Sequence, residues 1–322
     1  MFITNFLSRK TDYYNQRLLF TNDYYNGILP LIDTDCGIAK NIFQIALLGN
    51  NLSVNDVMES LPPAFVDNIN TLKNNNPEYE YHLYSDKEAE QFIKKYYGDG
   101  ILEYYQRIDN TYLAAKADLL RYLLLYALGG VYLDFKSTIE KPLSENLRED
   151  DQFLVFYWDN FSNGNHNCLI PDYIVKGEML QGFIISSKGH IFLREVILNV
   201  LKRIDRYNPY NSDTGVGWSG VITTVGPAVY TKSIYDIICR TGEGSNFVFR
   251  ESKPFGIFGY KVYFAEEKYT PGGYLKSLSM KDFRKNSRPV VKCQKKWLQK
   301  ANVLWLKLVL IYNRILIKFF GY

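Results

Sequence analysis

The stretch at residues 114–142 decides the fold, and it reads AAKADLLRYLLLYALGGVYLDFKSTIEKP. Its first half predicts an apolar helix, which the Gly-Gly pair at 129–130 ends because glycine adopts the backbone angles of a helix C-cap. A β-rich run follows at 131–133, and Asp134 stands at its end. Ligands of open α/β sheets bind at the carboxyl ends of the strands. The stretch therefore predicts an α/β fold with a ligand site near Asp134.

Two polar residues, Asp118 and Arg121, interrupt this apolar helix. They are three residues apart and so share one helix face. A structural ion pair would also explain them, although such pairs contribute little stability when they are exposed. Their fixed offset from the Gly-Gly-Val-Tyr-Leu-Asp run favours a functional pair.

The pattern A-x-x-[SA]-D-L-L-R-Y-x-x-L-Y-x-x-G-G-V-Y-L-D resembles the glycosyltransferases with a DXD-containing sugar-binding region. Yeast-type initiating α-mannosyltransferases and bacterial capsular polysaccharide transferases belong to that group. The resemblance implies that Asp118 accepts hydrogen bonds from hydroxyls of the donor sugar. It implies that Arg121 holds the sugar or its diphosphate, since a guanidinium fork matches such oxygens. Asp134 would face the ribose and the metal–diphosphate region, and Gln44 in the opening strand would lie beside the donor.

Lys136 stands where the family motif continues with a second Asp. In one interpretation its ammonium replaces the divalent cation at the diphosphate, and the enzyme is metal-independent. In another, Mn²⁺ or Mg²⁺ is held by Asp134 and the phosphates, with another acid elsewhere in the chain. In a third, the site is degenerate and inactive, which the intact Asp118, Arg121 and Asp134 argue against. Asp134 and Lys136 are thus the expected catalytic residues.

Expected strands and helices alternate along the chain. Strands are expected at 41–48, 78–84, 153–157 and 181–187, and helices at 57–75, 87–97, 189–206 and 227–238. Such alternation implies βαβ units and a mostly parallel sheet with flanking helices. Together with the resemblance, it predicts a GT-A-like, Rossmann-type fold. The opening strand departs from the family pattern, since Phe43 replaces the usual His and Ala46 the usual Trp.

The predicted organisation is a lead-in at 1–37, a transferase domain at 38–290 and a C-terminal helix at 291–322. The last helix carries Lys307, Arg314 and Lys318 on one stripe of an apolar surface. Each cation would cost about 2.5–3.5 kcal/mol at the bilayer centre, so a helix lying on the membrane surface fits better than a spanning one. A helix packed on the domain and a dimer contact are the alternatives.

Composition narrows the possible partners and the compartment. The net charge of +4 is too small to indicate a nucleic-acid partner. The four cysteines show no CxxC spacing, so a zinc site is not expected. The N-terminus lacks the pattern of a secretory signal. We therefore expect a cytoplasmic protein at the cytoplasmic face of the membrane.

Three pairs of residues, expected in loops near the carboxyl edge of the sheet, are weaker candidates for an acceptor site or a lid. Aromatic, acidic and amide side chains suit sugar stacking and hydroxyl binding, although ordinary loop packing would also explain them. The pairs are Trp158 and Asp159, Glu178 and Gln181, and Trp218 and Ser219.

The resemblance implies a retaining transferase that moves a hexose of the mannose, galactose or glucose class from a UDP- or GDP-sugar to a glycan or lipid-linked glycan. Such an enzyme would serve polysaccharide or capsule biosynthesis. Retaining transfer of this type depends on positioning and charge stabilisation, so no Ser-His-Asp set is required. A non-catalytic nucleotide-sugar or glycan-binding protein and a protein-glucosylating effector are the alternative hypotheses.

Overall fold

The computed structural model describes residues 22–139, 141–157, 174, 177–209, 216–241, 249–251, 257–258 and 289–292. The helices are α2 (Asn22–Ile28), α3 (Val54–Ser60), α4 (Pro63–Asn75), α5 (Asp86–Arg107), α6 (Leu113–Leu128), α7 (Ile191–Asp205), α8 (Gly217–Thr224) and α9 (Pro227–Thr241). The strands are β1 (Asn41–Ile45), β2 (Glu80–Tyr84), β3 (Gly130–Leu133), β4 (Thr138–Ile139), β5 (Phe153–Val155), β6 (Phe183–Ser186), β7 (Arg250–Glu251) and β8 (Ile257–Phe258). A short 3₁₀ turn spans Leu143–Glu145.

The central sheet has the strand order β2-β1-β3-β6-β5-β7. Strands β2, β1 and β3 are parallel, as are β5 and β7, while β6 runs antiparallel to both of its neighbours. The predicted α/β class with a mostly parallel sheet is confirmed. The chain passes from β1 to β2 on one side and then to β3 on the other, so the carboxyl ends of β1 and β3 meet where the strand order reverses. Crevices at such points bind ligands in this architecture.

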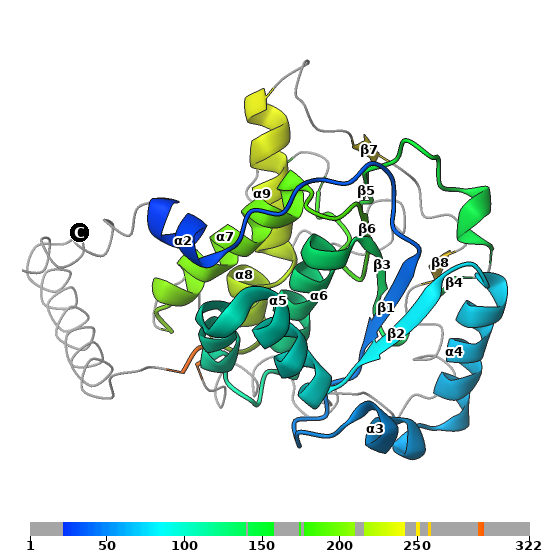
Figure 1. The fold of residues 1–322 in the computed structure, drawn as a ribbon. Helices are drawn as coiled ribbons and strands as arrows, with labels where there is room; N and C mark the ends of the chain where they lie inside the picture. The colour runs from blue at the N-terminus through cyan, green and yellow to red at the C-terminus, as the bar shows by residue number, and fades with distance from the viewer. Residues whose placement is uncertain are drawn as a thin grey trace, which may run out of the picture.

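Both faces of the sheet are buried, and the two-residue period of the strands decides which side chain faces which layer. Figure 1 shows α5 to α9 on one side of the sheet and α3 and α4 on the other. Side chains packed in the cluster with α5, α6 and α7 include Phe43, Tyr132, Phe153 and Ile184. Their sequence neighbours pack in a second cluster, together with Leu72 of α4, and include Ile42, Val131, Leu154 and Ile185.

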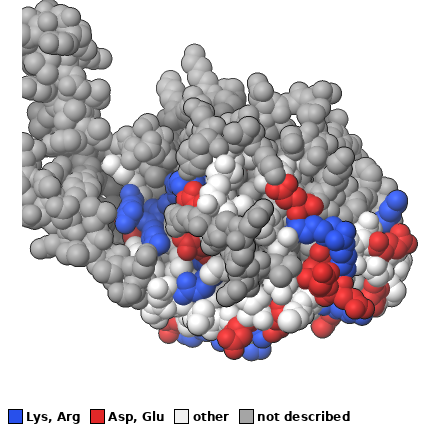
Figure 2. Space-filling view, turned by 90° about the horizontal axis from the view of Figure 1, so that it is seen from above, with Lys and Arg blue, Asp and Glu red and all other residues white. Residues whose placement is uncertain are grey.

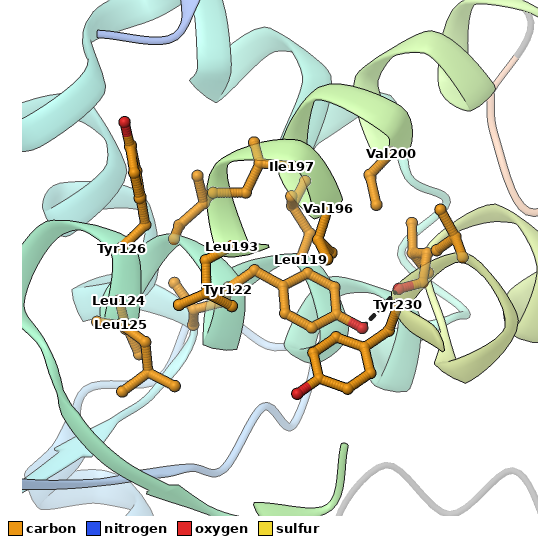
Figure 3. Packing of buried hydrophobic residues seen from close by; sticks show 14 of the residues in the cluster. Leu119, Tyr122, Leu124, Leu125, Tyr126, Leu193, Val196, Ile197, Val200 and Tyr230 are labelled. Atoms are coloured by element: carbon orange, nitrogen blue, oxygen red, sulfur yellow. Dashed lines mark hydrogen bonds between the residues drawn. The ribbon is translucent and has the colours of Figure 1, made fainter. Parts of the chain in front are cut away.

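Helix α6 is mostly apolar on all its faces, and it is buried between the sheet and the outer helices. Figure 3 shows its side chains interleaved with those of α7, and the Tyr122 ring lying parallel to that of Tyr230. The helix ends at Gly129, whose φ of 65° lies in the left-handed region. A Cβ there would stand 2.6 Å from the backbone nitrogen of Lys188, so glycine is required both for the turn and for the close approach.

Two sequence predictions about helices were wrong in detail. The helix expected at 57–75 is two helices, because the chain extends at Leu61 and Pro62 before Pro63 starts α4. The helix expected at 87–97 runs on to Arg107 as α5, with a break at Gly98, where φ is 73°. Glycine permits that backbone angle without the cost a Cβ would add.

Ser85 precedes α5, but its side chain does not cap the helix. Its hydroxyl donates to the carbonyl of Leu52 at 2.6 Å instead. The carboxylate of Asp86 accepts from the backbone nitrogens of Leu48 and Gly49 at 2.9 and 3.1 Å. These bonds fix the loop that follows β1.

The ends of the chain are described only in part. Helix α2 falls within the predicted lead-in, and its Tyr25 is buried and donates to Asp205 at 2.9 Å. The predicted membrane-surface helix lies outside the described residues except at 291–292, so it stays a prediction. Within the described ranges, no helix combines the length and hydropathy needed to cross a membrane.

Candidate functional site

The site begins at the end of β3, where successive side chains point to opposite faces of the sheet. Tyr132 and Asp134 face α6. The side chain of Phe135, the residue after Asp134, packs against α4 instead. The rings of Phe135 and Phe65 are stacked, with centroids 5.0 Å apart. The backbone therefore presents Asp134 to one helix layer while it is anchored by Phe135 to the other.

Arg121 is the centre of the cluster. Its Nη2 lies 2.9 Å from Oδ1 of Asp118, and its Nη1 lies 3.1 Å from Oδ1 of Asp134. Nη1 also donates to the carbonyl of Gln181 at 2.8 Å, and the guanidinium carbon stands 4.6 Å from the Tyr132 ring centroid. The side chains of Asp118 and Arg121 are only 6% and 7% exposed, whereas that of Asp134 is 27% exposed. Asp134 is thus the member of the cluster that is most open to a ligand.

One guanidinium serves two carboxylates in this cluster, so ionising both leaves a net negative charge. Burial raises the pKa of Asp118 to about 7, and the Asp134 carboxylate adds to the rise, while Arg121 and the hydrogen bond from Gln181 oppose it. Near neutral pH the Asp118 carboxyl group is therefore present in both its protonated and its ionised form. When ionised it can accept a hydrogen bond from a ligand hydroxyl, and when protonated it can donate one.

Residues 181–182 form the wall of the site opposite α6. The Gln181 amide accepts from the Tyr122 hydroxyl and donates to Asp118 Oδ1 at 3.3 Å. The carbonyl of Gly182 accepts from the backbone nitrogen of Asp134 at 2.7 Å. A Cβ at Gly182 would stand 3.1 Å from Asp134 Oδ2, so this position keeps room for the carboxylate.

Gln44 lies beneath the turn that carries Asp134. It is fully buried, and its Nε2 donates to the Asp134 carbonyl at 3.2 Å while its Oε1 accepts from the Tyr81 hydroxyl at 2.9 Å. The structure brings Gln44 to the predicted site, but it places the amide against the backbone. Its predicted contact with the donor stays a prediction.

Lys136 is half-buried and lies in the turn after β3. A hydrogen bond of 2.7 Å from the Ser137 nitrogen to the Asp134 carbonyl closes this turn. Among the described residues, the Asp134–Lys136 pair offers a divalent cation one carboxylate instead of two. Oδ1 of Asp134 already accepts from the Tyr132 hydroxyl at 2.8 Å and pairs with Arg121, and an ammonium cannot ligate a metal. In the described part of the chain, no group of three His, Cys, Asp or Glu side chains could hold a metal ion.

The weaker candidates are scattered. Glu178 is buried, and Gln181 joins the cluster described above. Trp218 and Ser219 lie half-buried on helix α8, so their predicted position in a loop was wrong. Trp158 and Asp159 lie outside the described residues. The roles of all of these in an acceptor site or lid stay predictions.

Two residues of this cluster, Tyr132 and Gly182, were not among the sequence predictions. For Tyr132 the signal was present, because it stands two residues before Asp134 and so shares its face of the strand. For Gly182 no signal existed, because its role arises from the pairing of β3 with β6.

Figure 2 shows another view of the molecule, in which acidic and basic side chains of the described residues lie interspersed rather than gathered by sign.

Sequence comparisons agree with this geometry. Residues 62–154 match the family model described as a glycosyltransferase sugar-binding region containing a DXD motif. An initiation-specific alpha-1,6-mannosyltransferase of Candida albicans is 24% identical over 249 residues, which are 71% of this chain and 60% of that protein. Inositol phosphoceramide mannosyltransferase 3 of Schizosaccharomyces pombe is 30% identical over 138 residues, or 42% of this chain and 32% of that protein. The chain thus spans less than two thirds of these relatives.

Among solved structures, PaToxG glycosyltransferase is similar with a TM-score of 0.43 and 17% identity, covering 74% of this chain and 81% of that one. The family match includes α4, α6 and β3, and therefore Asp118, Arg121 and Asp134. The resemblance predicted from these residues is confirmed: residues 62–154 match the model of the DXD-containing sugar-binding region of glycosyltransferases.

Proposed function

We propose that the chain is a nucleotide-sugar-dependent glycosyltransferase that transfers a hexose to a glycan acceptor with retention at the anomeric carbon. The observation that carries the proposal is the bridging of Asp118 and Asp134 by Arg121 at the carboxyl ends of β1 and β3. This cluster combines acceptors for sugar hydroxyls with a cation for phosphate at the place where α/β sheets bind nucleotides.

Each side chain has a role that its environment favours. Asp118, whose pKa is raised to about 7, would bind donor-sugar hydroxyls as acceptor or as donor. Arg121 would hold the sugar or the diphosphate, and the more exposed Asp134 would bind the ribose. Lys136 would supply a point charge to the leaving diphosphate, as lysine does at other phosphate sites.

The transfer reaction would need no co-reactant besides the sugar donor and the acceptor. The bond between sugar C1 and the phosphate oxygen breaks, and a bond between C1 and the acceptor oxygen forms on the same face of the sugar. The acceptor proton passes to the departing phosphate oxygen. The protein contributes positioning and stabilisation of the developing negative charge.

Relatives named as mannosyltransferases make mannose the first donor sugar to test. A non-catalytic nucleotide-sugar-binding protein is the second candidate, because Lys136 breaks the acidic motif. The acceptor would be a glycan or a lipid-linked glycan, and the C-terminal segment would hold the enzyme at the cytoplasmic face of the membrane.

The proposal is tested by incubating the purified chain with UDP- and GDP-hexoses and measuring nucleoside diphosphate release with and without glycan acceptors. We expect release with one donor, and its loss in Asp134→Asn. Asp99→Asn, at an exposed carboxylate that pairs with Lys94 at 3.2 Å, is the matched control and should remain active. Tight donor binding without turnover would support the binding protein, and neither binding nor turnover would refute both.

A further inference from the structure

The turn at residues 134–137 is held from beneath by a set of buried amide side chains. Nδ2 of Asn68 donates to the Ser137 carbonyl at 2.8 Å. Nε2 of Gln44 donates to the Asp134 carbonyl at 3.2 Å and reaches the Ser137 carbonyl at 3.5 Å. Both side chains are at least nine-tenths buried. The two carbonyls that flank Lys136 in the chain are therefore fixed by side chains, in addition to the turn's own hydrogen bond.

Helix α4 supplies most of this support. Besides Asn68, its Phe65 ring stacks on Phe135 inside the turn, with an interplanar angle of 12°. Further along the helix, Asn75 donates to the Ile139 carbonyl at 3.1 Å, and Asn76 accepts from the Leu143 nitrogen at 2.8 Å. One face of α4 thus follows the chain from the turn to the end of β4.

Buried amides at this place are costly unless every bond is made. Around Asn68 the interface is apolar, with Phe65, Ile69 and Phe135 in one cluster. Leucine would fill the space, but the Ser137 carbonyl would lose its 2.8 Å bond and keep the longer bond from Gln44 at 3.5 Å, at a cost in the range of a lost buried hydrogen bond. The amide therefore fixes the turn in one position, whereas apolar packing alone would allow it to shift.

We propose that Asn68, together with Gln44, is a positioning residue for the transfer reaction and acts through Lys136. This inference rests on the proposed function. With the turn fixed, the Lys136 ammonium and the Asp134 carboxylate keep one geometry relative to the leaving diphosphate. Interactions that form in the transition state are weakened most when the groups that make them are slightly displaced. Freeing the turn therefore lowers kcat more than it raises the KM for the donor.

The test compares Asn68→Leu with Asn75→Leu, which removes a similar bond from the same helix outside the turn. We expect Asn68→Leu to lower kcat by about 10- to 100-fold with little change in donor KM, and Asn75→Leu to leave kcat within about threefold. Circular dichroism and thermal melting show whether the two variants are equally folded. If Asn68→Leu does not fold, Asn68→Ala, which introduces no bulk, takes its place.

A double-mutant cycle with Lys136→Met separates positioning from general destabilisation. If Asn68 acts through Lys136, the Asn68 substitution should cost much less in the Lys136→Met background, because the group being positioned is gone. Equal losses in both backgrounds, or equal kcat losses in the Asn68 and Asn75 variants, would overturn the inference while the proposed function stands. A parent chain that neither turns over nor binds a nucleoside diphosphate would instead refute the proposed function itself.

Discussion

At the scale of single residues, the unusual feature is a buried arginine shared by two carboxylates. Arg121 compensates the charge of Asp118 or of Asp134 well, but it cannot fully compensate both. Asp118 is the more deeply buried of the two, so its ionisation carries the larger desolvation cost. The charge state of the site should therefore change within the physiological range of pH.

The first prediction concerns the stability of the Asp118→Asn variant. The pKa of Asp118 is raised in the folded chain from 3.8 to about 7, so the native state binds the proton more tightly than the unfolded state does. The stability that this proton contributes is fully present below pH 4 and is lost as the pH rises to about 7. The slope approaches about 1.4 kcal/mol per pH unit within that window.

Asp118→Asn lacks this titration. Urea unfolding of both proteins at several pH values should show the parent losing stability relative to the variant between pH 4 and pH 7. A pH-independent difference would show that Asp118 titrates normally in the folded chain.

The second prediction concerns Lys136. If its ammonium takes the place of a divalent cation, turnover of the parent should resist EDTA. Lys136→Asp would restore two acids in the motif, and its turnover should become dependent on Mn²⁺, since carboxylate oxygens bind such cations. Lys136→Met controls for loss of the charge and should be impaired with and without metal. Strict Mn²⁺ dependence of the parent would exclude the substitution of cation by lysine.

At the scale of secondary-structure elements, the pairing of β3 with β6 completes the site. Strand β6 is antiparallel to β3, so the entry of β6 at residues 181–182 meets the exit of β3 at Asp134. The backbone bond from the Asp134 nitrogen to the Gly182 carbonyl ties the two together at 2.7 Å. The carboxylate thereby gains a wall that lies almost fifty residues away in the sequence.

The third prediction follows from the space at Gly182. A methyl group there would press on Asp134 Oδ2 at 3.1 Å, and the carboxylate would have to rotate or shift. Gly182→Ala should reduce kcat/KM by about tenfold or more while thermal melting stays near that of the parent. Gly27→Ala, where a Cβ meets nothing within 4 Å, should leave activity unchanged. Full activity in Gly182→Ala would remove this wall from the site.

At the scale of the whole molecule, two helix layers enclose the sheet and leave the carboxyl ends of β1 and β3 at one edge (Figure 1). A glycan acceptor or lipid-linked glycan would have to approach that edge. The C-terminal segment at 291–322 combines basic and apolar side chains, as membrane-surface helices do.

The fourth prediction is that deleting residues 301–322 releases the protein from membranes. The full chain should sediment with vesicles containing anionic lipid, and the shortened chain should stay in the supernatant with unchanged circular dichroism. In the full chain, replacing Lys307, Arg314 and Lys318 by Glu should weaken binding to the vesicles. The binding that remains should depend less on salt concentration. A shortened chain that still sediments, or that unfolds, would contradict the anchor hypothesis.

Much of the fold was predictable because its signals are local. The apolar run of α6, its Gly-Gly end and the alternating strands each carry their information within a few residues. The break between α3 and α4 was missed, because a helix-compatible pattern continues through it. The extension of α5 past Gly98 was missed for the opposite reason, since a glycine there is typical of a helix end. The antiparallel direction of β6 was also missed, since strand direction depends on how the connections pack and not on the strand's own residues.

The sequence by itself determined which residues form the site: Asp118 and Arg121 share a helix face, and Asp134 ends a strand, whatever surrounds them. Only the tertiary structure decided how these residues are charged and held. Burial raises the pKa of Asp118, Gln181 and Gly182 approach from an antiparallel strand, and the amides of Gln44 and Asn68 fix the turn of Lys136. The physical reason is that chemical identity and local periodicity are properties of the chain, whereas desolvation and hydrogen bonding across elements exist only after distant segments have packed.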